Sequence, residues 1–248
     1  MLKTTVILGL WLNVAVLFGQ NLPDRIAEFR DAVYTWAGDA AYLARLGSET
    51  QEWAKRELSE TELFNALSFC EYLTGRAYQN EGNEAEAIRH YQNGLDIASA
   101  YVKKTPTADG YRMMAENISK LCTLKSTAWV IANGTKVASY SKKGLGYDPR
   151  NAACAYMIAA RWVYAPTILS NINKGIKDMK DILSGKYDLQ KDDYFNVCYS
   201  LAYAYNRNKQ PDEVKPWLEK ALSVYPENRD ALELLQGKAW IVDSVDSR

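Results

Sequence analysis

The 248 residues of this chain include one histidine, His90, which limits the chemistry that histidine could perform. We therefore expect neither a histidine-based catalytic triad nor a multi-histidine metal site. His90 is expected to be an ordinary surface residue. The sequence also contains no Cys-x-x-Cys pair, which argues against a dithiol redox site or a zinc knuckle.

Acidic pairs and glycine runs are the other features that could carry chemistry. The pairs Asp192 with Asp193, and Asp178 with Asp181, fall at predicted helix starts or on polar faces, where we expect them to cap helices and stay solvated. The run Gly144-Leu145-Gly146 lacks the helix opening and the Lys-Ser/Thr that a phosphate-binding loop requires. The sequence thus predicts no catalytic residue, cofactor or metal ligand, and we expect a protein that is not an enzyme.

The cysteines have two possible states. The sequence has four of them, in segments expected to form the first helix of a helix pair: Cys70, Cys122, Cys154 and Cys198. An even number of cysteines in an exported protein permits two disulfides. Cysteine also behaves as a small buried hydrophobe. We favour buried free thiols over two disulfides.

Two stretches, 68–101 and 195–228, carry the same order of small and bulky residues. The intervals between the key positions are three, nine, four and three residues in both copies. These positions are Gly75, Tyr78, Ala87, Tyr91 and Gly94 in the first copy, and Ala202, Tyr205, Val214, Leu218 and Ala221 in the second, with Pro226 after them. Small residues at such positions let two helices cross closely, and a period of about 34 residues is typical of a helix–turn–helix repeat. The chain therefore resembles the tetratricopeptide repeat (TPR) family.

The rest of the chain follows the pattern less well. Degenerate repeats are expected over 107–149, where Asn133-Gly134 would divide the two helices, and over 150–187. In the latter, Pro166 should end or kink the first helix, and residues 171–175 are expected to form a polar turn. An apolar stripe from Ile26 to Trp36 begins an N-terminal helical hairpin, and a last helix carries Leu232, Leu235 and Trp240.

The resemblance implies an all-α fold. We expect a TPR-like superhelix of about four helical hairpins, flanked by the N-terminal hairpin and a C-terminal capping helix. Residues 21–248 would form a single helical-repeat domain. In this family the groove is lined by first-helix residues that do not face their own second helix.

By repeat position, eleven polar and aromatic residues are candidates for the groove that binds a partner. They are Tyr72, Arg76, Gln79, Asn80, Tyr156, Arg161, Tyr164, Tyr199, Tyr203, Asn206 and Arg207. Tyrosine gives contact area at low entropic cost and is enriched at binding sites. Arginine can hold a carboxylate with two parallel hydrogen bonds. The alternative is that the tyrosines pack between repeats and the arginines are solvated.

The N-terminus predicts export. Residues 1–20 have a positive start at Lys3 and an apolar core from Val6 to Phe18, as a secretory signal peptide does. Cleavage after Gly19 would leave no stable membrane insertion, and an uncleaved N-terminal anchor is the alternative. We expect a periplasmic location. Lysine plus arginine equals aspartate plus glutamate at 30 each, so no global field favours nucleic acid.

These features favour a scaffold that binds a protein or peptide segment in its groove. The run from Arg161 to Pro166 and the repeat array also resemble, more loosely, exported bacterial TPR proteins that accompany TRAP-type solute transporters. That resemblance implies an alternative, a small-molecule-binding accessory protein with a closed pocket lined by Tyr156, Arg161 and Tyr164.

Overall fold

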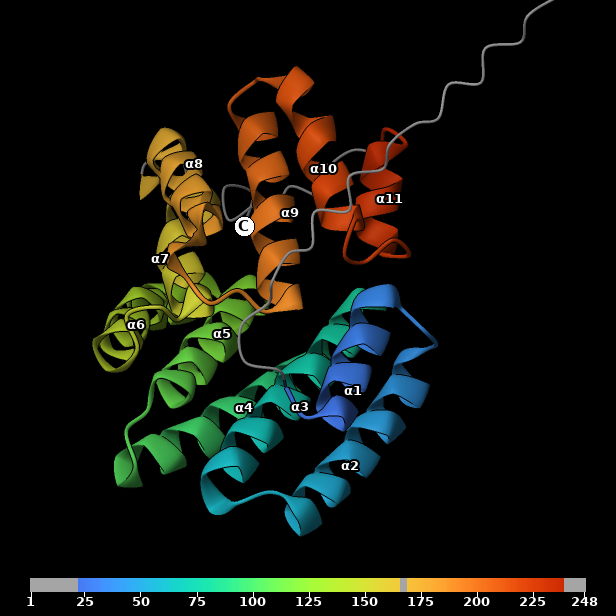
Figure 1. Ribbon diagram of the computed structural model, residues 1–248, viewed down its shortest axis with the longest axis vertical. Coiled ribbons are helices and arrows are strands. Elements are labelled where there is room, and N and C mark those ends of the chain that lie inside the picture. The colour runs from blue at the N-terminus through green and yellow to red at the C-terminus, as the bar shows by residue number, and fades with distance from the viewer. Residues whose placement is uncertain (1–21, 166–168, 239–248) are drawn as a thin grey trace, which may run out of the picture.

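The computed structural model describes residues 22–165 and 169–238, and these residues are almost entirely helical (Figure 1). Eleven α-helices follow one another along them. Their bounds are α1 Asp24–Thr35, α2 Ala40–Glu57, α3 Glu60–Asn80, α4 Glu84–Lys104, α5 Ala108–Leu124, α6 Thr127–Tyr147, α7 Ala152–Tyr164, α8 Ile172–Asp181, α9 Lys191–Arg207, α10 Val214–Leu222 and α11 Arg229–Leu235. The predicted all-α, TPR-like superhelix is confirmed.

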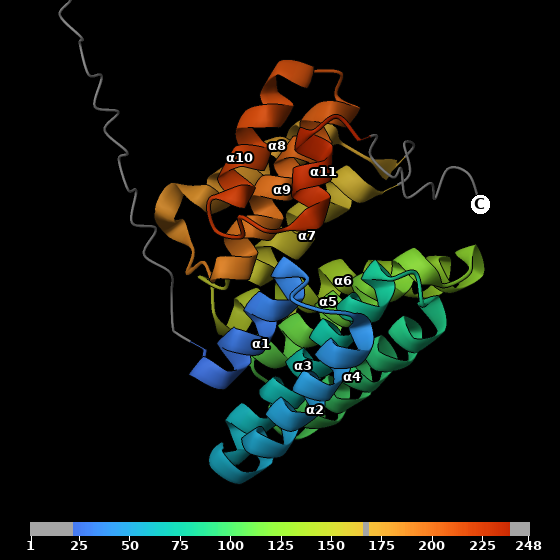
Figure 2. The ribbon, with the colours of Figure 1, turned by 90° about the vertical axis from the view of Figure 1, so that its right-hand side faces the viewer.

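The helices stack as antiparallel neighbours, each packed on the one before and after it. The helices α3, α5, α7 and α9 are the first helices of pairs completed by α4, α6, α8 and α10. In Figures 1 and 2, α8 to α11 form the upper part of the molecule and α1 to α6 the lower part. The stack therefore curves, and its end approaches its beginning.

Small residues set the distance between paired helices. A Cβ added at Gly75 would lie 2.7 Å from the ring of Tyr91, so α3 and α4 approach through that glycine. A Cβ at Gly144 or at Gly175 would meet Cys154 or Val163 at 2.5 Å, which brings α6 and α8 equally close to α7. Real Cβ atoms do not come this near other atoms, so each site requires glycine.

The starts of α3, α6 and α8 are set by local capping residues. Ser59 and Glu62 form a capping box at the start of α3, with the Ser59 N–H donating to Glu62 at 3.1 Å. The prediction for Asn133-Gly134 is wrong, because both residues lie inside α6 and the turn between α5 and α6 falls at Lys125 and Ser126. The predicted polar turn at 171–175 is also wrong beyond its first residue, because Asn171 caps α8 and Ile172 begins it.

Some predictions fall outside the described residues. Residues 1–20, Pro166 and Trp240 belong to this group. Within the described ranges, α7 ends at Tyr164 and α11 ends at Leu235. No helix of these ranges is both long and apolar enough to cross a membrane.

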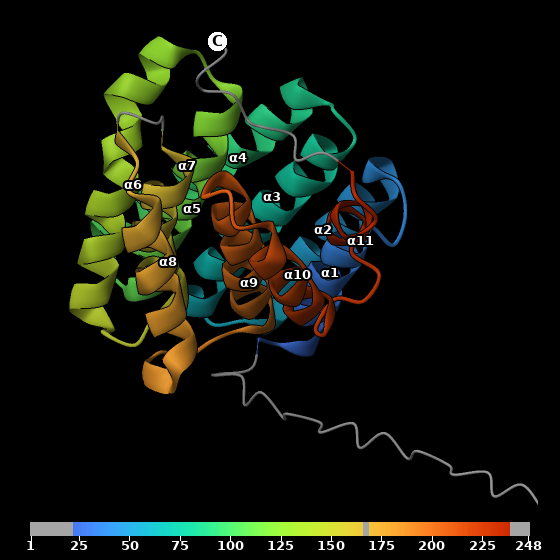
Figure 3. The same cartoon turned by 90° about the horizontal axis from the view of Figure 1, so that it is seen from above.

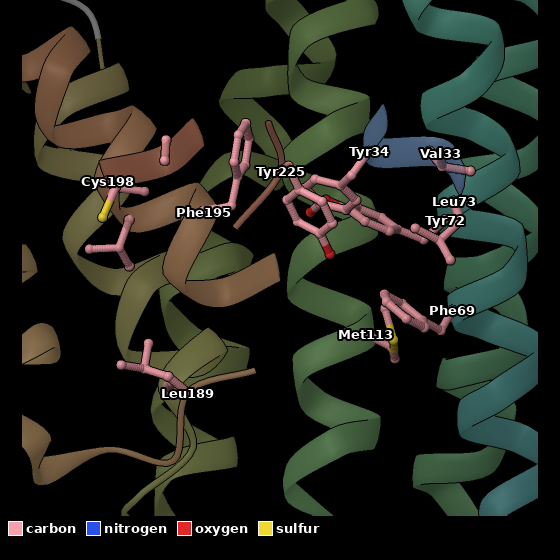
Figure 4. Packing of buried hydrophobic residues seen from close by; sticks show 14 of the residues in the cluster. Val33, Tyr34, Phe69, Tyr72, Leu73, Met113, Leu189, Phe195, Cys198 and Tyr225 are labelled. Atoms are coloured by element: carbon pink, nitrogen blue, oxygen red, sulfur yellow. The ribbon is translucent and has the colours of Figure 1, made fainter. Parts of the chain in front are cut away.

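The N-terminal helix α1 joins the two ends of the stack. Its residue Tyr34 is 1% exposed and stacks on Tyr225 with 4.8 Å between ring centroids, while Phe195 of α9 meets it edge-on at 5.5 Å (Figure 4). The amide of Asn228 donates to the Tyr34 carbonyl at 2.7 Å, and Asn196 donates to the Tyr34 hydroxyl at 2.9 Å. Seen from above, α9 and α10 lie over α1 and α3 (Figure 3). Residues nearly 200 positions apart thus share one core.

The close approach of α3 and α4 predicts the effect of adding one methyl group. Gly75→Ala forces its Cβ against the fully buried Tyr91 ring, and we expect the free energy of unfolding to fall by about 1–3 kcal/mol. Gly146→Ala is the control, because nothing lies within 4 Å of its Cβ on the exposed side of α6, and alanine is the better helix former. Chemical denaturation of both variants measures the difference. A stability of Gly75→Ala equal to that of the wild type would contradict the crossing.

Candidate partner-binding face

The first helices bring a group of aromatic and charged residues together. We call the inner face the set formed by Tyr72, Arg76, Glu116, Tyr156, Tyr164, Tyr199 and Tyr203, from α3, α5, α7 and α9. Arg76 and Glu116 both act electrostatically on Tyr156, which in turn acts on Tyr164. The tyrosines and the arginine of this set were predicted from repeat position, whereas Glu116 was not.

Arg76 is the central cation of the inner face. Its guanidinium lies over the ring of Tyr34 at 4.4 Å and is 3.5 Å from the Tyr72 hydroxyl. Its Nε is buried and has no hydrogen-bond partner among the described residues. Glu116 is only 6% exposed, and one of its oxygens, Oε2, also lacks a partner there. Buried polar atoms are nearly always paired, so this part of the inner face has unused hydrogen-bonding capacity.

The neighbours of Arg76 on α3 are used in packing. Gln79 accepts a hydrogen bond from the Tyr91 hydroxyl at 2.7 Å and donates to Thr123 at 3.1 Å, so it ties α4 and α5 to α3. With its amide turned to suit its neighbours, Asn80 accepts from the Trp36 indole N–H and donates to the Arg76 carbonyl, both at 3.2 Å. These two side chains hold the helices that frame the inner face.

The second group of tyrosines meets around Ser200 of α9. The hydroxyls of Tyr156 and Tyr164 lie 2.9 and 2.8 Å from the Ser200 hydroxyl. The Tyr164 ring stacks on Tyr203 at 5.0 Å. Tyr164 is 38% exposed, yet burial raises its pKa well above the ordinary value. Its exposed fraction places Tyr164 on the accessible part of the inner face.

The remaining predicted residues lie at the end of α7 and α9. Arg161 is exposed and its guanidinium stacks 4.0 Å from the ring of Trp162. Asn206 is exposed. Arg207 donates to the Val163 carbonyl and, at 3.4 Å, to the Ala165 carbonyl. It therefore satisfies carbonyl groups that the end of α7 leaves without helical partners.

An ionic junction, buried except at Lys191 and Asp31, joins α1, α5 and α9, and no sequence pattern predicts it. Asp192 accepts from Arg30 at 3.3 Å and from Arg112 at 3.5 Å. Lys191 pairs with Asp31 at 2.7 Å, and the Tyr225 hydroxyl donates to the same carboxylate at 2.9 Å. We define the junction as Arg30, Asp31, Arg112, Glu116, Lys191, Asp192 and Asp193.

The junction corrects the prediction that Asp192 and Asp193 are solvated. Their exposed fractions are 2% and 3%. Asp193 does cap α9, because it accepts the Gln190 N–H at 3.0 Å. Burial, only partly offset by Arg112, raises its pKa to about 7, and burial also raises the pKa of Glu116. The only sequence sign of this was the adjacency of two acids, which a helix start explains equally well.

His90 and the four cysteines were the other candidates for chemistry, and the structure gives each of them a packing role. His90 is only 12% exposed and bonds Glu71 at 2.7 Å, so the prediction of a surface residue is wrong. All four cysteines are free thiols, and Cys122 alone among them is not fully buried. Burial raises the pKa of Cys122 to about 11, which keeps it as an unreactive thiol at neutral pH. Within the described ranges no three acidic, cysteine or histidine side chains are placed to hold a metal ion.

An open pocket of about 450 Å³ lies on the surface of α1 and α2. Its lining includes Arg25, Trp53 and Arg56. None of Tyr156, Arg161 and Tyr164 contributes to it, so this pocket is separate from the inner face.

Comparison with known proteins gives two results for the fold. Residues 195–228 match the family model of the tetratricopeptide repeat. The chain is also similar to a solved thermophilic TPR protein of Thermus thermophilus, with 17% identity, a TM-score of 0.56, and coverage of 86% of this chain and 96% of that one. Similarity to YrrB, a TPR protein with an unusual peptide-binding site, is weaker, at 13% identity, a TM-score of 0.39, and coverage of 79% and 90%. No curated protein matches the sequence.

The role of Arg207 at the end of α7 predicts a local destabilisation. Arg207→Met keeps the length of the side chain but leaves the Val163 and Ala165 carbonyls without this donor, and we expect a loss of about 1.5–3 kcal/mol. Arg161→Met is the matched control on the same segment, where an exposed stacking contact contributes less than about 1 kcal/mol. Hydrogen exchange should show faster opening of the last turn of α7 in the first variant. Equal exchange in the two variants would contradict the capping role.

Proposed function

We propose that this chain is a non-enzymatic scaffold that binds a protein or peptide segment along its inner face, in an exported, periplasmic compartment. The fold supports the class of function, since stacked helical repeats present extended concave surfaces to their partners. The apolar stretch at residues 1–20, with Lys3 before it, supports the location.

One observation carries the proposal, namely the unused polar atoms among the tyrosines of the inner face. Arg76 Nε needs an acceptor and Glu116 Oε2 needs a donor. Each residue of a peptide offers one carbonyl acceptor and, except at proline, one N–H donor. An extended peptide that enters between the first helices would satisfy both atoms, which protein now covers. The less buried Tyr156 and Tyr164 would supply apolar contact area.

The alternative is a small-molecule-binding accessory protein of a TRAP-type transporter. It requires a closed pocket bounded by Tyr156, Arg161 and Tyr164, of about 300–1,000 Å³. Arg161 is exposed beside Trp162 and does not bond either tyrosine in any described contact. The open pocket on α1 and α2 lies elsewhere. We therefore favour the peptide partner.

Site-specific photo-cross-linking tests the proposal. A photoreactive phenylalanine analogue replaces Tyr164 on the inner face or, as the control, Ile131, which is 76% exposed on α6. We expect cross-links to a distinct protein segment from position 164 in an envelope extract, and not from position 131. Identical products from both positions would contradict the inner face as the binding site.

The cross-linked segment then allows a quantitative test. A synthetic peptide of that sequence should bind the wild-type chain, and Arg76→Gln should weaken the affinity about tenfold, or about 1.4 kcal/mol. Arg161→Gln, outside the inner face, is the control and should leave the affinity unchanged. An Arg76→Gln variant that folds and binds as tightly as the wild type would contradict the role of Arg76.

A further inference from the structure

The junction connects parts of the chain that the repeat stack alone would leave apart. Arg30 and Asp192 are separated by 162 residues, and Arg112 and Asp192 by 80. Repeat helices contact their neighbours along the stack, but here the first helix meets the first helix of the last pair. The Asp192 carboxylate of α9 pairs with Arg30 of α1 and with Arg112 of α5, so three helices meet at this residue.

The junction also covers part of the inner face. α1 is fixed at one end by Arg30 and Asp31, and its Tyr34 lies over the guanidinium of Arg76. Because α1 also packs on α3, moving these two helices away from α9 would break the ion pairs of the junction and separate Tyr34 from Phe195 and Tyr225. This movement would open the inner face beside Arg76.

The charges of the junction do not balance. Its buried part contains two guanidinium groups, of Arg30 and Arg112, against three carboxyl groups, those of Glu116, Asp192 and Asp193. Lys191 and Asp31 form a half-exposed pair beside them, and Arg76 attracts Glu116 more weakly than Arg112 does. Burying an unpaired charge is costly, so one carboxyl group is favoured in its neutral form. Asp193 suits this role, because its nearest cation, Arg112, is 3.9 Å away and is shared with Glu116 and Asp192.

We propose that the junction is a latch that holds α1 against α9 and loosens as the pH rises, which gives a partner access to the inner face. The part concerning a partner rests on the proposed function. The latch itself does not require one.

The direction follows from the proton on Asp193. Burial is the largest cause that raises its pKa from 3.8 to about 7 in the closed protein. Opening brings water to the junction and lowers this pKa, so opening releases a proton. The stabilisation of the closed form is complete below the pKa of the open form and is lost as the pH rises through about 7. One proton changes the open-to-closed ratio by at most about tenfold per pH unit.

Charged groups on neighbouring helices raise or lower the pKa of Asp193. From α5, Arg112 lowers its pKa and Glu116 raises it, and from α9 Asp192 raises it. Asp109 of α5 and Cys154 of α7 also lie in this field. On α1, Arg30 and Asp31 pair with each other and with α9. No histidine of the described ranges faces the junction, so a response near neutral pH would come from a carboxyl group.

Distance measurements between spin labels on α2 and α10 test the latch without any partner. Labels at Lys55→Cys and Lys215→Cys, two exposed sites, report the opening of the superhelix in a Cys122→Ser background. We expect a longer-distance population to appear as the pH rises from 5.5 to 7.5, with the open-to-closed ratio increasing by up to about 25-fold. An unchanged distance distribution would overturn the proposal.

Two variants assign the effect to the junction. Asp193→Asn mimics the protonated carboxyl and can still accept the Gln190 N–H, so we expect this variant to remain closed at both pH values. Asp188→Asn makes the same change in an exposed pair with Arg150 and should respond like the wild type. A pH response in Asp193→Asn equal to that of the wild type would overturn the proposal.

A third variant covers the case in which Asp193→Asn does not fold. Arg30→Gln removes the α1 cation from Asp192, and we expect it to be more open than the wild type already at pH 5.5. A closed Arg30→Gln variant would overturn the latch. Because none of these measurements uses a ligand, failure of the latch leaves the peptide proposal to its own cross-linking test, and the reverse also holds.

Discussion

The packing of α1 against α9 and against the segment between α10 and α11 is the contact on which the shape of the molecule depends. The stacking of Tyr34 on Tyr225 and the bond from Asn228 to the Tyr34 carbonyl are made between opposite ends of the chain. Without them the helix pairs would still stack, because Gly75, Gly144 and Gly175 bring neighbouring helices together locally. The two ends of the curved stack would then no longer contact each other, and the inner face would be an open surface.

The polar residues of the first helices fall into two groups. Gln79, Asn80 and Arg207 use their hydrogen bonds to hold helices in place. Arg76, Glu116 and Tyr164 keep unused atoms or accessible surface. The stable frame and the surface available to a partner are therefore built from neighbouring residues on the same helices, which is why repeat position alone does not separate them.

The sequence predicted the features that depend on short-range spacing. The glycine at 75 and the placement of Tyr156 and Tyr164 on a first helix both follow from intervals of a few residues. The ionic junction could not be predicted in this way, because Asp192 meets Arg30 only after the whole stack has curved. The prediction of a turn at Asn133-Gly134 was wrong for a related reason. The dipeptide favours turns in isolation, but the helix pair α5 and α6 packs Val137 and Ser141 on one side of a continuous helix.

The central claim is that a partner contacts the inner face, and tyrosine ring resonances report on it directly. In a protein labelled on its tyrosine rings, titration with the cross-linked peptide should shift the signals of Tyr72, Tyr156 and Tyr164. Those of Tyr42 and Tyr147, which are 45% and 57% exposed away from this face, should stay in place. Shifts confined to Tyr42 and Tyr147 would contradict the account.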